Sequence, residues 1–177
     1  WEEVRRAVVI DPAIARSAKD FDADINLVNL PSGTLDLQAG QITSHQPLDL
    51  ITQLAGADPK PYRGSRFQRF VHEVCGEDSE LAKFIQRAFG SCLGGLHDDH
   101  WFMFIYGQGR NGKSLLIEVI CAALGDYALC IPSAALMSTK NPINKDVFAQ
   151  LAGKRLVVSS EVESGAHFDE PLLKQLT

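Results

Sequence analysis

The sequence lacks the features that mark several specialised classes of protein. No stretch approaches the roughly 18 consecutive apolar residues that a membrane-spanning helix needs, so we expect no membrane partner. The first residues, from Trp1 to Arg6, have neither the apolar core of a secretion signal nor the pattern of an amphipathic transit peptide. An initiator methionine is also missing, and we expect the chain to be a piece of a longer protein.

Cysteine and net positive charge are scarce as well. The four cysteines, at positions 75, 92, 121 and 130, fit neither a CxxC zinc pattern nor a dense disulfide framework. We therefore expect a reduced, intracellular, soluble protein. Lys and Arg number 17 against 22 Asp and Glu, and the net charge is -5, so the chain lacks the basic excess of a stand-alone nucleic-acid-binding domain.

What the chain does contain is enough apolar material for a core. Of its 177 residues 45% are hydrophobic and 22% charged, as in an ordinary globular protein of one domain or slightly more. Apolar and polar residues alternate between positions 25 and 43, with turn residues between the runs, and predict a small β-meander. A connector with several Pro and Ala residues, positions 47–61, leads to two amphipathic helices. The first starts at Arg66 and ends near Gly76, and the second is capped by Asp78 or Ser79.

The second half has a different pattern. The continuous apolar run Trp101–Tyr106 predicts a strand that is buried on both faces. A glycine-rich loop and an apolar helix, closed by Gly125, come next. Further elements are expected as a strand over 127–131, a helix over 146–151 and a second buried strand over 155–160. Alternating strands and helices predict a parallel α/β domain over 99–177, after a small α+β domain over 1–98.

Residues 107–114 read Gly-Gln-Gly-Arg-Asn-Gly-Lys-Ser and match the phosphate-loop motif GxxxxGK[ST] in full. Glycines let consecutive backbone N–H groups point inward, and a helix that starts at Lys113 adds its positive N-terminal dipole. We expect Lys113 to act in catalysis at the β- and γ-phosphates of ATP, and the Ser114 hydroxyl to bind Mg²⁺. The residues assigned to nucleotide binding are Gly107, Gly109, Asn111, Gly112, Lys113 and Ser114.

A phosphate loop also needs a carboxylate at the end of a neighbouring strand. This carboxylate holds Mg²⁺ through water and orients the attacking water. Glu161 and Glu163 stand at the end of the predicted strand 155–160. We assign Glu161 to catalysis and to Mg²⁺, with Glu163 as a second catalytic candidate. The alternative is that both carboxylates cap the strand on the surface.

These motifs together resemble the phage and plasmid primase-helicase family. The resemblance rests on the loop, on the run Leu151–Glu163 and on the run Asp169–Thr177, in that order. The family is related to the poxvirus primase-helicase and belongs to the superfamily 3 helicases, which have an AAA+ ATPase core. The resemblance therefore implies a truncated, AAA+-like P-loop NTPase sheet over 99–177, and it implies that residues 1–98 are the accessory domain that precedes this core.

The resemblance also implies a function and partners. It implies ATP-driven unwinding of DNA during phage, prophage or plasmid replication in the bacterial cytoplasm. Full-length members work as rings, usually hexamers, together with a primase domain or a primase partner. The sensor asparagine, the arginine finger and most of the DNA-binding hairpin are expected beyond Thr177, so we expect this chain alone to be weak or inactive.

Two other functions and two weaker patterns stay open. A small-molecule phosphotransferase would share Lys113 and Ser114, but no Arg-bearing lid follows Gly125. A non-catalytic assembly module would use residues 1–99 for docking. The basic residues Lys60, Arg63, Arg66 and Arg69 either contact single-stranded DNA together with nearby aromatic rings or form an ordinary solvated helix face. The run His97–His100 either binds a metal or is a polar loop.

Overall fold

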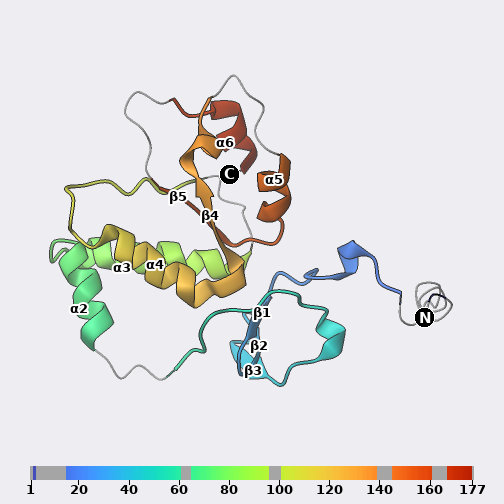
Figure 1. Cartoon of the computed structure of the whole chain (residues 1–177). Helices are drawn as coiled ribbons and strands as arrows, with labels where there is room; N and C mark the ends of the chain where they lie inside the picture. The colour runs from blue at the N-terminus through green and yellow to red at the C-terminus, as the bar shows by residue number, and fades with distance from the viewer. Residues whose placement is uncertain are drawn as a thin grey trace.

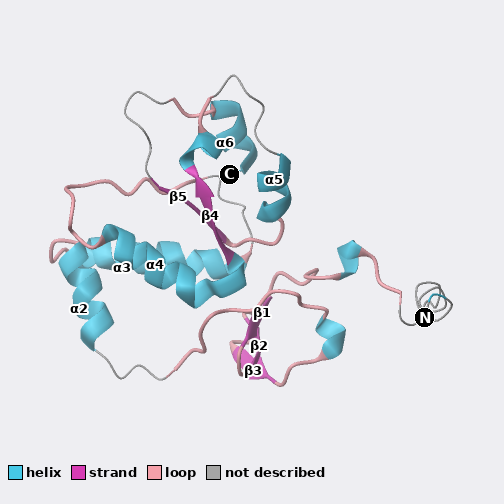
Figure 2. Cartoon of the chain, in the orientation of Figure 1, coloured by secondary structure: helices cyan, strands magenta, loops and turns pink. Residues whose placement is uncertain are grey.

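The computed structural model describes Glu2 and residues 15–60, 65–95, 101–138, 145–160 and 167–176. They form a mixed α/β fold with a three-stranded antiparallel sheet and a two-stranded parallel sheet (Figure 1; Figure 2). The strands are β1 (Leu27–Leu30), β2 (Gly33–Asp36), β3 (Gln41–Thr43), β4 (Ala128–Pro132) and β5 (Leu156–Ser160). The helices are α2 (Ser65–Val74), α3 (Ser79–Ser91), α4 (Lys113–Leu124), α5 (Lys145–Leu151) and α6 (Glu170–Leu176). No helix in these ranges is long and apolar enough to cross a membrane.

The predicted β-meander is confirmed. Strands β1, β2 and β3 pair in sequence order, and every pair is antiparallel. The β1–β2 turn consists of two residues, because Leu30 pairs with Gly33 across it. Along β1, Val28 and Leu30 are buried, while Leu27 and Asn29, which alternate with them, are half-buried. This alternation is the reason that the sequence pattern identified the strand.

The two helices of the first half are confirmed too. The Asp78 carboxylate caps α3 and accepts hydrogen bonds from the N–H groups of Glu80 (2.9 Å) and Leu81 (3.0 Å). The apolar stripe of α3 is only partly covered. Ala88 is buried, but the side chains of Leu81 and Phe84 are exposed.

The prediction of a buried strand over Trp101–Tyr106 is wrong. These residues form a loop, and the side chain of Tyr106 is 82% exposed. An apolar run shows that its side chains favour burial, but a strand also needs a neighbour that pairs with its backbone. Among the described residues no strand pairs with this run.

The strand–helix–strand order of the second half is confirmed over β4, α5 and β5. Strands β4 and β5 are parallel neighbours and pair from Ala128 with Leu156 to Pro132 with Ser160. However, the side chain of Val157 is 41% exposed, so β5 is not buried on both faces as predicted. A strand is buried on both faces only where a second layer covers each face, and the described residues leave Val157 open. The two strands do not make the larger parallel sheet of a P-loop NTPase, and that architecture stays a prediction.

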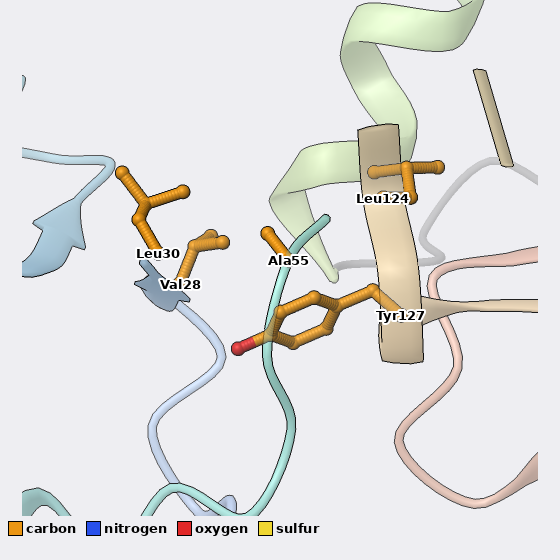
Figure 3. Close-up of a cluster of buried hydrophobic side chains, with 5 residues drawn as sticks. All are labelled: Val28, Leu30, Ala55, Leu124 and Tyr127. Atoms are coloured by element: carbon orange, nitrogen blue, oxygen red, sulfur yellow. The ribbon is translucent and has the colours of Figure 1, made fainter. Parts of the chain in front are cut away.

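The main buried cluster joins side chains from both halves of the chain. The cluster contains Leu124, the last residue of α4, and Tyr127 in the turn that follows (Figure 3). These side chains pack with Val28 and Leu30 of β1 and with Ala55 of the connector. The domain boundary that we expect near residue 98 lies outside the described residues, and nothing in the fold tests it. The cluster shows that the meander is packed onto the end of α4.

The connector is bound in place by backbone hydrogen bonds. Its residues 53–56, here called the strap, lie between β1 and the end of α4. Three N–H groups make the bonds: Asp126 to the Leu54 carbonyl (2.9 Å), Gly56 to the Ala123 carbonyl (3.0 Å), and Ala55 to the Asn29 carbonyl (2.8 Å).

A glycine at position 125 permits this close approach. Gly125 has a φ of 56°, in the left-handed region, and a Cβ built on it would lie 2.5 Å from the Leu54 carbonyl oxygen. Any other residue would be strained at this φ, and its Cβ would clash with the strap.

Arg155 is the buried cation of this junction. Its side chain is 8% exposed, and its guanidinium donates hydrogen bonds to the carbonyls of Leu93 and Leu27, the latter at 2.6 Å. The guanidinium carbon lies 4.7 Å from the ring centroid of Tyr127, whose hydroxyl accepts the N–H of Asn29 at 2.9 Å. Burial lowers the pKa of Arg155 and raises the pKa of Tyr127. Arg155, which directly precedes β5, therefore links this strand to the meander and to the segment after α3.

Candidate nucleotide-binding site

The glycine-rich loop contains three residues with a positive φ. Gly107, with a φ of 148°, and Gly112, with a φ of 84°, adopt conformations that residues with a Cβ rarely take. Between them Arg110 also has a positive φ, of 63°. Gly112 is the N-cap residue of α4, so this helix begins at Lys113 as predicted.

The Lys113 side chain turns back into the concave side of the loop. Its ammonium donates hydrogen bonds to the carbonyls of Gly107 (3.2 Å) and Gln108 (2.8 Å) and to the side-chain oxygen of Asn111 (2.7 Å). The positive charge is thus held within the loop, at the start of α4. A bound phosphate oxygen would be a stronger partner for the ammonium than a neutral carbonyl.

Two further features fit an anion at this point. The first N–H groups of a helix have no partner inside the helix, and they carry the positive end of its dipole. Ser114 is exposed in the first turn of α4, directly after Lys113. The donors present here suit a phosphate group, and a serine hydroxyl suits Mg²⁺, which prefers oxygen ligands.

Other predicted site residues fall outside this part of the structure or stay untested. Glu161 and Glu163 lie outside the described residues, as do Arg63 and the run His97–His100. In the described ranges no group of three His, Cys, Asp or Glu side chains could hold a metal. Gly109 lies in the loop, but no contact there tests its expected role.

The basic stripe is partly described. Arg66 and Arg69 are exposed on α2, and Phe67 beside them is 46% exposed. The ring of Phe70 is half-buried, with its centroid 6.2 Å from that of Phe67. The DNA-binding interpretation and the solvated-face interpretation both stay predictions.

Sequence reasoning missed two side chains that lie against Gly112 of the loop. A Cβ built on Gly112 would lie 2.8 Å from Val74 Cγ2 and 3.1 Å from Phe70 Cε2. Both side chains belong to α2, more than thirty residues earlier in the chain. Their helical spacing identified an apolar face, but no local signal indicated what this face covers.

Comparison with known proteins now adds to this geometry. Residues 3–76 match the family model described as D5 N terminal like. The chain is also similar to a protein of Acanthamoeba polyphaga mimivirus described as a "Putative helicase", with 24% identity over 169 residues. The aligned region covers 93% of this chain but 16% of that relative, so the chain spans about a sixth of the relative's length.

These findings support the resemblance of the chain to the primase-helicase family. The family match ends just after α2, so it includes the meander, the strap and the helix that lies against Gly112. The expected resemblance is thus supported at the level of the family, while the superfamily 3 assignment, ATP binding and unwinding remain to be tested.

Proposed function

We propose that this chain is the ATP-binding part of a replicative DNA helicase of the superfamily 3 type. In the longer protein, ATP hydrolysis would be coupled to DNA unwinding. The observation that carries the proposal is the loop 107–114, in which the Lys113 ammonium lies inside the curve at the start of α4. The similarity to the mimivirus helicase supports the choice of a helicase over other phosphate-binding proteins.

Each residue of the loop has a defined task in this proposal. The backbone N–H groups and Lys113 hold the β- and γ-phosphates, because charge-assisted hydrogen bonds are the strongest that the site offers. On binding, the ammonium exchanges the carbonyls of Gly107 and Gln108 for phosphate oxygens. The Ser114 hydroxyl and the Glu161 carboxylate hold Mg²⁺, which neutralises charge that develops on the phosphates.

The remaining roles concern the longer protein. Glu161 orients the attacking water, with Glu163 as the second candidate. Self-association into a ring, as a hexamer, places ATP between subunits, and DNA is bound mostly by residues after Thr177. A primase domain or primase partner accompanies the helicase in the cytoplasm of the bacterial cell, where the phage or plasmid is copied.

Titration of this chain with a fluorescent ATP analogue and Mg²⁺ tests the carrying observation. Wild type binds, and Lys113→Ala weakens binding by about 10- to 100-fold, the equivalent of one charge-assisted hydrogen bond. Lys83→Ala is the matched control, because Lys83 is an exposed lysine on α3 that forms an ion pair with Glu80 at 2.8 Å. Equal affinity of the two variants would contradict the proposed site.

A further inference from the structure

The outer side of the phosphate loop rests on α2. With a Cβ at Gly112, Val74 and Phe70 would be only 2.8 and 3.1 Å away, and a distance below 3.0 Å is one that folded proteins essentially never show. The apolar face of α2 therefore lies as close to the loop as a glycine permits. The Phe67 ring lies beside the Phe70 ring on the same helix, with 6.2 Å between the two centroids.

We infer that α2 is a positioning element of the nucleotide site, with Phe70 and Val74 as positioning residues that set the conformation of Gly112. This inference rests on the proposed function, since it assigns the helix a part in nucleotide binding. Neither side chain would touch the nucleotide. Both act through the backbone that presents the phosphate-binding groups.

The position of Gly112 explains why its support matters. This residue is the N-cap of α4 and directly precedes Lys113, so its φ of 84° sets where the helix N-terminus and the lysine begin. A loop that is already held in its binding conformation loses less entropy when the ligand arrives. Removing methyl groups behind Gly112 opens a void, and the loop then has more conformations to lose.

The same contact works in the opposite direction. If α2 favours the binding conformation of the loop, a bound nucleotide must stabilise α2 by the same free energy. The helix lies within the segment 3–76 that matches the D5 N terminal like model. The accessory region would thus respond to nucleotide through Phe70 and Val74.

The test compares two valine truncations in the whole chain. Val74→Ala removes the methyl groups next to Gly112, while Val71→Ala makes the same change at a half-buried position one turn earlier on α2. We expect similar losses of thermal stability. Affinity for mant-ATP with Mg²⁺ should fall about tenfold in Val74→Ala and stay within about twofold in Val71→Ala.

Hydrogen exchange of the wild type gives a second readout that needs no variant. Saturating mant-ATP should slow amide exchange over residues 70–75 by about threefold or more, while α3 stays unchanged. Equal affinities of the two variants, or unchanged exchange in α2, would overturn the inference and leave the proposed function intact. Failure of the wild type to bind mant-ATP would overturn both.

Discussion

Replacing Tyr127 by phenylalanine removes one hydroxyl from the contact between β1 and the end of α4. The side chain of Tyr127 is 2% exposed, and its hydroxyl accepts the backbone N–H of Asn29 at 2.9 Å. The ring itself would stay in the buried cluster (Figure 3). It would also stay under the Arg155 guanidinium. The variant therefore isolates a single hydrogen bond of this junction.

The expected loss follows from the donor that is left behind. A buried N–H without a partner costs about 1–3 kcal/mol, and the lower part of this range applies because Asn29 is only half-buried. We expect the free energy of unfolding to fall by about 1–2 kcal/mol. For a chain of this size, each kcal/mol corresponds to a shift in Tm of roughly 2–4 °C.

Urea unfolding followed by circular dichroism measures this loss. Tyr106→Phe is the matched control, because Tyr106 is exposed and the same atom is removed. The control should stay within about 0.5 kcal/mol of wild type. A Tyr127→Phe variant as stable as wild type, or two variants destabilised equally, would refute the account of the junction.

Three further predictions concern the same part of the molecule. Arg155→Met leaves two carbonyls without their donor and should lower the free energy of unfolding by about 2–4 kcal/mol. Urea unfolding measures this loss, and an unchanged value would contradict the role of the guanidinium. In Gly125→Ala the new methyl group would clash with the strap, and the positive φ would be strained, so the free energy of unfolding should fall by at least about 1–2 kcal/mol. Gly90→Ala in α3 has open space around the new methyl group, so the free energy of unfolding should rise by roughly 0.5–1 kcal/mol. Burial and the neighbouring Cys130 thiol raise the pKa of Cys121 to about 11. Iodoacetamide at pH 8, followed by peptide mass spectrometry, should therefore modify exposed Cys130 first, and the rate at Cys121 should rise about tenfold per pH unit below its pKa. Equal rates at pH 8 would contradict this order.

Local patterns predicted most of the elements in the described residues. The meander follows from alternation along β1 and from its turn residues, and α3 begins where the Asp78 side chain can cap it. The start of α4 at Lys113 follows from the glycine before it. In each case the residues that decide the structure are neighbours in the sequence.

Contacts between distant residues could not be predicted in this way. The run Trp101–Tyr106 has the composition of a buried strand, but the composition does not supply a pairing partner. Arg155 precedes an apolar strand and its sequence neighbours give no sign that it is buried against the Leu27 and Leu93 carbonyls. The same holds for the site, where the loop was predicted and its support by α2 was not.

ATP hydrolysis with and without single-stranded DNA tests the central claim most directly, on a chain that continues past Thr177. The account predicts that DNA stimulates turnover and that Glu161→Gln abolishes it. Glu80→Gln, at an exposed carboxylate on α3, serves as the control and should leave turnover unchanged. Turnover that is indifferent to DNA, or that survives Glu161→Gln, would contradict a helicase motor with Glu161 at its catalytic centre.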